Sequence, residues 1–305
     1  MEKLKVAILG ASGIGKFHAR DFSNAGCDVC AILGSSKESS IKTAEMLKEK
    51  FRINAKPYYE IEELLKEKLD AAAICTPPLL HEEQARKCLQ RGLHVLCEKP
   101  FVFNKNYQGY EITKKLFESA ERKGKILTVN TQWPCILENL EKYIEINKIR
   151  EFSMYMEPGT KGIGLITEMV PHMNSMLIRL VPGGKATNID FLVLREDEIK
   201  VRFDYDNGKN NCKVEYDIRF KADRPRAVVF NINKHMFERA IGDNYQQFLL
   251  HGNEKIVIPD PFSGSINKFI AATSGAYSPL ISEEEILENV KLQDEIIKMY
   301  LAQAA

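Results

Sequence analysis

Two patterns of hydrophobic positions divide the chain near Trp133. Before this residue, short runs of consecutive apolar residues alternate with amphipathic stretches, which is typical of buried parallel strands separated by helices. After it, apolar and charged residues alternate one by one, as in antiparallel strands with one face in water. The patterns therefore predict an α/β domain followed by an α+β domain.

The first part contains strand-like runs that are separated by helix-like stretches. The predicted strands are residues 6–9, 29–33, 71–75, 94–97 and 126–130. The predicted helices are residues 14–24, 39–51, 79–91 and a long stretch that ends near Lys123. Because helices that join parallel strands form right-handed crossovers, we expect a doubly wound parallel sheet in residues 1–132.

The clearest element of the second part is an antiparallel hairpin. Residues 199–205 and 212–220 alternate apolar and charged side chains, and Asp206-Asn207-Gly208-Lys209 between them predicts a turn whose Asn-Gly pair readily takes positive φ. Further strands are expected near residues 187–194, 227–232 and 255–258.

The chain closes with an amphipathic helix. Ser282-Glu-Glu-Glu285 matches a capping box, and the helix that it opens is expected to end near Met299. Residues 133–305 are therefore predicted to form an α+β domain with a large open, mostly antiparallel sheet and helices on one face.

Composition and charge exclude several classes of protein. The 305 residues are 44% hydrophobic and 28% charged, and 43 basic against 42 acidic residues leave a net charge of +1, so no nucleic-acid or anionic-lipid partner is expected. No apolar run approaches the ~20 residues that a membrane span requires. The charged start Met1–Lys5 does not resemble a signal peptide, and we expect a cytoplasmic protein.

The seven cysteines are scattered along the chain. Cys27-Asp28-Val29-Cys30 is a CxxC, which can indicate redox or metal chemistry. It lies at the start of a predicted strand, and no second CxxC or Cys/His pair at ligand spacing accompanies it. Buried reduced thiols are the favoured explanation, and no metal site is predicted.

The stretch Gly10-Ala11-Ser12-Gly13-Ile14-Gly15 joins the first predicted strand to the first predicted helix. Backbone amides at such a helix start can hold a pyrophosphate, and glycine lets the ligand approach closely. Ser12 stands where the G-x-G-x-x-G pattern has its second glycine, and a tight structural turn is the alternative explanation. The position after a buried strand favours a Rossmann dinucleotide site that contains Gly10, Ser12, Gly13, Ile14 and Gly15.

The type of dinucleotide is predicted from the end of the second strand, where an acidic residue would bind the ribose 2′-hydroxyl of NAD. Here the strand is followed by Ser35, Ser36 and Lys37, two hydroxyls and a cation that suit a 2′-phosphate. The sequence therefore favours NADP over NAD, with these three residues binding the cofactor. In the alternative, Lys37 is a solvated residue at a helix start, and Glu38 or a water serves the ribose.

The third strand continues as AAAICTPPLLHEEQARKCLQRGLHVLCEKPF, residues 71–101. With Thr76-Pro77-Pro78, His81, Gly92-Leu-His-Val95 and Glu98-Lys99-Pro100 in this order, the chain resembles the glucose–fructose oxidoreductase / inositol dehydrogenase (Gfo/Idh/MocA) family. The glycine loop and the parallel-then-antiparallel order agree with the family, so the resemblance covers essentially the whole chain.

The resemblance assigns roles to these motifs. It implies that Glu98 and Lys99 face the cofactor, that Lys99 takes part in catalysis, and that the cofactor site includes Thr76, Pro77, Pro78 and His81. Ligands of open parallel sheets bind beyond the carboxyl ends of the strands, where both motifs lie. The Lys99–Pro100 peptide bond can be cis or trans.

The family also supplies a base from a helix of the second domain, in a pattern that resembles Asp-x-Gly-x-His. The matching stretch here places Glu168 and His172 four residues apart, on one face of a helix. The resemblance makes His172 the candidate base, oriented by Glu168 or Lys99, while a structural histidine is the alternative. Glu168 stands where the family usually has Asp, and Ser175 stands where many members have a second Asp.

Another departure follows the fifth strand, where Asn130-Thr-Gln132-Trp133-Pro134 replaces a common Arg-Phe pair. Gln132 and the single tryptophan, Trp133, could bind a polyol by hydrogen bonding and ring stacking, although Trp133 could equally belong to the core. The missing arginine argues against an obligatory anionic substrate.

These observations predict an NAD(P)-dependent oxidoreductase that acts on a secondary alcohol or hemiacetal carbon of a sugar, polyol or related cyclic compound. Lys99, with a pKa lowered by desolvation and by the oxidised nicotinamide, would hydrogen-bond the reacting oxygen. Lys99, Gln132, Trp133 and His172 would contact the substrate. The alternatives are a non-catalytic dinucleotide-binding regulator and a redox-neutral hydrolase or epimerase with bound NAD. The resemblance also implies a homodimer or larger homo-oligomer that pairs through the second sheet.

Overall fold

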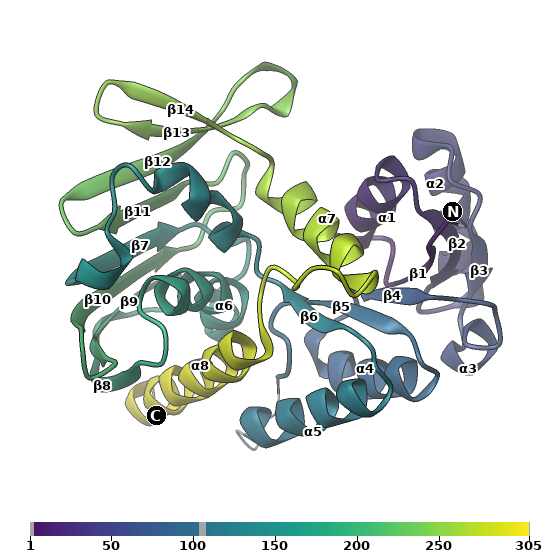
Figure 1. The fold of residues 1–305 in the computed structure, drawn as a ribbon, viewed down its shortest axis with the longest axis horizontal. Helices are drawn as coiled ribbons and strands as arrows, with labels where there is room; N and C mark the ends of the chain where they lie inside the picture. Colours follow the sequence, from purple (N-terminus) through teal and green to yellow (C-terminus); the bar gives the residue numbers. More distant parts are fainter. Residues whose placement is uncertain (1–2, 104–107, 305) are drawn as a thin grey trace. The chain divides into compact units, whose positions relative to one another are not determined.

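The computed structural model describes residues 3–103 and 108–304, and the chain forms two compact units (Figure 1). The first unit comprises Met1–Asn130 and Ser265–Glu283, and the second comprises Thr131–Gly264 and Glu284–Ala305. The predicted fold class is confirmed, because one unit contains a six-stranded sheet and the other an eight-stranded, mostly antiparallel sheet.

The sheet of the first unit has the strand order β3-β2-β1-β4-β5-β6, and all of its neighbours are parallel. Its strands are β1 (Lys5–Leu9), β2 (Asp28–Leu33), β3 (Lys56–Tyr58), β4 (Ala71–Ile74), β5 (His94–Glu98) and β6 (Leu127–Asn130). Every residue of β4 is buried, which is why its apolar run is continuous. The five predicted strands are confirmed, and the three-residue β3 was not predicted because so short a segment has no periodicity.

The helices of this unit cover both faces of its sheet. They are α1 (Gly15–Asn24), α2 (Lys37–Phe51), α3 (Ile61–Leu64), α4 (His81–Gln90), α5 (Gly109–Arg122) and the 3-10 turn η1 (Pro78–Leu80). Helices α1 and α2 lie on one face, and α4 and α5 lie on the other (Figure 1). The segment Ser265–Glu283 also belongs to this unit. Its Phe269 packs edge-on against Phe22 of α1, and its Ile281 carbonyl accepts a hydrogen bond from Thr128 of β6.

The sheet of the second unit has the order β14-β13-β12-β11-β7-β10-β9-β8, with β7 and β10 parallel and every other pair antiparallel. Its strands are β7 (Glu151–Met156), β8 (Lys185–Leu194), β9 (Glu198–Asp206), β10 (Asn211–Arg219), β11 (Val228–Ile232), β12 (His235–Ile241), β13 (Gln247–His251) and β14 (Glu254–Ile258).

Strands β9 and β10 form the predicted hairpin. Their inward side chains are buried, and Phe203 and Tyr205 are 1% exposed. Their outward side chains form ion pairs across the strands, such as Lys213 with Asp204 at 2.6 Å. In the turn only Gly208 has a positive φ, at 81°, while the Asn207 side chain accepts a hydrogen bond from the backbone of Asn210 at 2.8 Å.

The helical segments of the second unit are η2 (Trp133–Leu140), η3 (Ile146–Lys148), α6 (Ile163–Leu180) and α8 (Glu283–Ala304). Helix α7 (Pro261–Thr273) begins in this unit and continues into the first. Helix α6 contacts β7, β10 and η2. In the part of the chain that the structure describes, no helix combines the length and apolar character needed to cross a membrane.

Candidate functional site

The predicted site residues fall into two groups, one in each unit. The first group follows the carboxyl ends of the parallel strands of the first unit, and the second lies on α6 and η2 of the second unit.

The glycine loop connects β1 to α1 and passes close to the turn after β4. Gly10 has φ +84°, and a Cβ there would lie 2.8 Å from the backbone carbonyl of Cys75, so only glycine fits this position. A Cβ on Gly13 would meet no atom within 4 Å, and Ser12 and Gly13 are exposed. Helix α1 begins at Gly15, with Ile14 as its N-cap. The open loop before a helix start fits a dinucleotide pyrophosphate.

The loop after β2 presents a hydroxyl and a cation. Ser36 is the N-cap of α2, where its hydroxyl accepts a hydrogen bond from the Ser39 amide at 3.1 Å. Its capping role occupies this hydroxyl, whereas Ser35 and Lys37 beside it are exposed. Exposed donors at this position suit the 2′-phosphate of an adenosine ribose.

Glu98, the last residue of β5, is a buried anchor between three elements. His18 Nε2 on α1 lies 2.7 Å from Glu98 Oε1, and Asn130 Nδ2 at the end of β6 donates to the same oxygen at 2.7 Å. The Lys99 amide donates to Glu98 Oε2 at 3.3 Å. This carboxylate therefore joins α1, β5 and β6 directly beside Lys99.

The same contacts keep Glu98 ionised. Burial raises its pKa, but the hydrogen bond and charge of His18, with further contributions from Lys99 and Asn130, outweigh burial and lower the pKa to about 2. Glu98 is 7% exposed, so its side chain contacts the Lys99 loop from the protein interior.

His81 connects the two predicted cofactor loops. Its Nε2 lies 2.8 Å from the Thr76 carbonyl oxygen and its Nδ1 lies 2.8 Å from the Pro100 carbonyl oxygen. Burial lowers its pKa, against the effect of the two carbonyls, so the neutral ring donates to one of them at a time. His81 is 0% exposed, and Thr76 also donates to Gln84 at 2.6 Å.

Lys99 follows this anchored strand end, and Pro100 follows it through a cis peptide bond. The side chain of Lys99 is half-buried, while Pro77 and Pro78 form the turn after β4 on the same edge of the sheet. The first unit thus gathers the glycine loop, the Thr76-Pro77-Pro78 turn and Lys99 at its carboxyl edge.

In the second unit, Glu168 and His172 lie one turn apart on α6. His172 is 6% exposed, and Glu168 is half-buried. Pro171 lies inside the helix, where it cannot donate to the Thr167 carbonyl. The carbonyl of Pro171 accepts instead two side-chain hydrogen bonds, from Ser175 Oγ at 3.0 Å and from Asn289 Nδ2 at 2.8 Å.

A buried polar network holds this part of α6. Ser175 Oγ lies 2.6 Å from Thr131 Oγ1, and Asn289 of α8 also donates to Ser175 Oγ at 2.8 Å. Tyr216 of β10 donates to Asn174 Oδ1 at 3.1 Å. Ser175, at the position where the family often has Asp, is therefore part of the support of the helix that carries His172.

Trp133 is the first residue of η2, and Gln132 directly precedes it. Trp133 is 3% exposed, and the guanidinium carbon of Arg239 lies 5.7 Å from the centre of its ring. Gln132 is half-buried. The sequence pattern did not single out Arg239, because it lies on β12, a strand that was not predicted.

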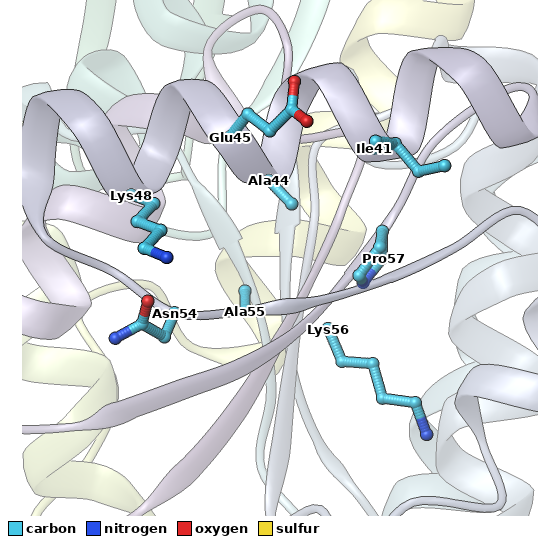
Figure 2. A pocket seen from close by; sticks show the side chains of 8 residues that line it. All are labelled: Ile41, Ala44, Glu45, Lys48, Asn54, Ala55, Lys56 and Pro57. Carbon is cyan, nitrogen blue, oxygen red and sulfur yellow. The ribbon is translucent and has the colours of Figure 1, made fainter.

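A surface hollow of about 380 Å³ lies between α2 and β3, away from the candidate site (Figure 2). It is lined by Ile41, Ala44, Glu45, Lys48, Asn54, Ala55, Lys56 and Pro57. None of these lining residues is among the predicted cofactor-binding residues, so the hollow is not the predicted cofactor site.

Sequence reasoning missed His18, Asn130, Asn289 and Arg239. His18 carried a weak signal, since a histidine on the apolar side of a predicted helix needs a partner, but that partner is Glu98, 80 residues away. The roles assigned to the named site residues stay predictions.

Comparisons with known proteins agree with this arrangement. Residues 4–131 match an oxidoreductase family with an NAD-binding Rossmann fold. An uncharacterized oxidoreductase of Schizosaccharomyces pombe is 32% identical over 106 residues, which are 33% of this chain and 27% of that protein. The scyllo-inositol 2-dehydrogenase (NADP(+)) IolW of Bacillus subtilis is 28% identical over 218 residues, 65% of this chain and 57% of the enzyme. The chain thus matches less than two thirds of the length of either relative.

A solved structure extends the similarity to both units. The UDP-N-acetylglucosamine 3-dehydrogenase GnnA from Acidithiobacillus ferrooxidans has a TM-score of 0.75 and 16% identity, with 97% of each chain covered. At this identity the comparison shows a shared fold.

Proposed function

We propose that this chain, whose residues 4–131 match the Gfo/Idh/MocA family of oxidoreductases, is an NAD(P)-dependent dehydrogenase or reductase. Its substrate would be a sugar, polyol or related cyclic compound with a secondary alcohol or hemiacetal carbon. The relative IolW, named as an inositol dehydrogenase, supports this substrate class.

The arrangement of Lys99 carries the proposal. A lysine follows β5 at the edge of the sheet where dinucleotides bind, and Glu98 and His81 hold the loop on both sides of it. A merely structural strand end would not need a buried carboxylate at this point, because burying that charge is costly.

A bound nicotinamide would supply the hydride acceptor at C4 when an alcohol is oxidised. In that direction an imidazole nitrogen of His172 would accept the hydroxyl proton of the substrate as its C=O bond forms. Lys99 would donate a hydrogen bond to the reacting oxygen, and Glu168 would orient His172. Reduction runs through the same groups in reverse.

We further propose a preference for NADP. The exposed Lys37 and Ser35 at the start of α2 support it, as does the relative IolW, whose name specifies NADP(+). Lys37→Ala should raise the dissociation constant of NADP⁺ about threefold to tenfold and leave that of NAD⁺ unchanged. The expected increase is modest because solvent screens the charge of an exposed lysine. Lys42→Ala, an exposed lysine further along α2, is the matched control.

The enzymatic proposal is tested by NAD(P)H absorbance against a panel of sugars, inositols and their ketones. Lys99→Ala should retain dinucleotide binding and lower turnover about 10²–10⁴-fold. Unchanged turnover would remove Lys99 from the mechanism. A cofactor that co-purifies with the protein and turnover without net absorbance change would instead establish the redox-neutral class.

A further inference from the structure

Arg239 lies on the inward face of β12. Phe237, two residues earlier on the same face, is fully buried. The guanidinium of Arg239 packs over the ring of Trp133, and its Nη2 donates to the Arg226 carbonyl oxygen at 2.6 Å. These two contacts fix the position of the cation beside Trp133, a predicted substrate-binding residue.

The charge of Arg239 has no carboxylate partner among residues 3–103 and 108–304, and its Nε is buried there without a hydrogen-bond acceptor. The negative charge of Asp260 raises the pKa of Arg239. The two carboxylate oxygens of Asp260, however, accept hydrogen bonds from the Phe262 amide at 3.1 Å and from the Ser263 hydroxyl at 3.5 Å, at the start of α7. Burial, together with Arg224, lowers the pKa of Arg239.

A second buried group on this face also lacks a partner in the described parts of the chain. Gln247 of β13 has a buried Oε1 without a donor. Arg239 pairs with Leu249 across the two strands, so Gln247, two residues before Leu249, projects from the same face. The Nε of Arg239 and the Oε1 of Gln247, both buried without a hydrogen-bond partner, are costly unless a ligand completes them.

We infer that Arg239, with Trp133 beneath it, binds an anionic group of the substrate, a carboxylate or a phosphate. This inference rests on the proposed function and narrows its substrate to an acidic or phosphorylated sugar or polyol. Trp133 opens η2, and η2 packs against α6, the helix that carries His172. The planar guanidinium presents Nε and one Nη side by side, a geometry that matches two oxygens of such an anion.

The inference reverses the expectation drawn from the missing arginine after the fifth strand. The chain does provide an arginine at this point, but from β12, more than a hundred residues later in the sequence.

Tryptophan fluorescence tests the anion site without turnover, because Trp133 is the single tryptophan of the chain. The full chain is titrated with inorganic phosphate, glucose 6-phosphate, glucuronate and glucose at constant ionic strength, with and without saturating NADP⁺. We expect the anions to change the fluorescence and glucose to leave it unchanged. A stronger response to the phosphates identifies a phosphorylated substrate, and a stronger response to glucuronate identifies an acid.

Arg239→Gln should raise the dissociation constant of the anion about 10- to 100-fold, which is the effect of a charge-assisted hydrogen bond. Arg202→Gln, an exposed arginine paired with Glu215 on the outward face, should leave it unchanged. Arg239→Lys keeps the charge but lacks the planar pair of donors, and it replaces Arg239→Gln in the titration if that variant does not fold. The affinity of Arg239→Lys for the anion should also fall. In addition, phosphate should raise the melting temperature of the wild type.

Equal responses of wild type and Arg239 variants would overturn the inference, as would an anion response that disappears once NADP⁺ is bound, because the anion would then have occupied the cofactor site. Fluorescence and melting need no catalysis. A positive anion result with no activity on any alcohol would therefore reject the proposed function while leaving the anion site in place.

Discussion

At the scale of single residues, Glu98 shows how a buried charge can serve an active-site loop. Its carboxylate is the acceptor for groups on α1, β5 and β6, and its lowered pKa means that it stays charged in the folded protein. A charge in this position is tolerated because hydrogen bonds replace the water that it has lost. Glu98 is therefore a positioning residue for Lys99.

Glu98→Gln keeps the size of the side chain and removes its charge. We expect the free energy of unfolding near neutral pH to fall by about 1–3 kcal/mol, because three hydrogen bonds lose a charged acceptor. The folded-state pKa of about 2 lies below the ordinary value of 4.5, so this stabilisation is fully present above the ordinary value and is lost as the pH falls toward 2.

Urea unfolding of wild type and variant between about pH 7 and pH 3 measures this difference. A difference that did not shrink toward acid pH would contradict the assigned pKa. Glu118→Gln, at an exposed position of α5, is the control and should stay within about 0.5 kcal/mol of wild type.

Gly10 and Gly13 give a matched pair within one loop. Gly10→Ala should cost about 1–3 kcal/mol of stability and weaken dinucleotide binding, because the new Cβ would meet the Cys75 carbonyl and φ is +84°. Gly13→Ala should leave the melting temperature nearly unchanged, since no atom lies within 4 Å of its Cβ position. Equal melting temperatures for the two variants would show that the close approach at Gly10 is not limiting.

At the scale of elements, α6 is supported by side-chain hydrogen bonds from its own residues and from α8. Pro171 interrupts the backbone hydrogen bonds one residue before His172, and side chains from α6 itself and from α8 bind the Pro171 carbonyl. Arg179 of α6 also pairs with Glu285 of α8, where Nη2 donates to Oε2 at 2.9 Å. Helix α8 therefore sets the position of the helix that carries the proposed base.

Asn289→Ala should test this support. We expect a loss of about 1–3 kcal/mol, because the Pro171 carbonyl and the Ser175 hydroxyl both lose a buried donor. Turnover should fall with little change in KM if α8 orients α6. Asn231→Ala removes a single hydrogen bond to Ser153 on β7 and is the control, with a smaller loss and unchanged turnover. Equal effects of the two substitutions would remove the special role of Asn289.

At the scale of the whole molecule, the outward face of the second sheet has two parts of different character. On β9 and β10 the charges pair within the chain, as Lys200 does with Glu215 at 3.2 Å and with Asp217 at 3.3 Å. On β12 to β14 the face exposes apolar side chains, with Met236 at 53%, Leu250 at 37% and Val257 at 56%. The predicted homo-oligomer would therefore bury the β12–β14 part and leave the charged part near water.

Light scattering after size-exclusion chromatography measures this prediction. We expect a dimer or larger assembly for the wild type and a shift toward the monomer for Met236→Asp, because a carboxylate would be buried in the interface. Lys209→Asp in the β9–β10 turn should leave the mass unchanged. A wild-type monomer at all concentrations would reject assembly through this sheet.

The sequence by itself determined the architecture and the place of the cofactor motifs. Continuous apolar runs predict parallel strands, and parallel strands carry their carboxyl ends to one edge, so Gly10, Thr76 and Lys99 could be assigned to the same edge before any coordinates. The alternating hairpin on either side of Asn207-Gly208 was equally predictable, since period two distinguishes a half-buried strand. These features depend on neighbours along the chain.

The tertiary structure decided everything that depends on distant partners. The local pattern could not show that His18 and Asn130 hold Glu98, that Asn289 supports Pro171, or that Arg239 covers Trp133, because the first of these partners are 80 residues apart and the last more than a hundred. Hydrogen bonds and desolvated charges depend on proximity in space, which periodicity does not record. For this reason the fold was predictable from the sequence, whereas the support of Lys99 and His172 and the anion site were not.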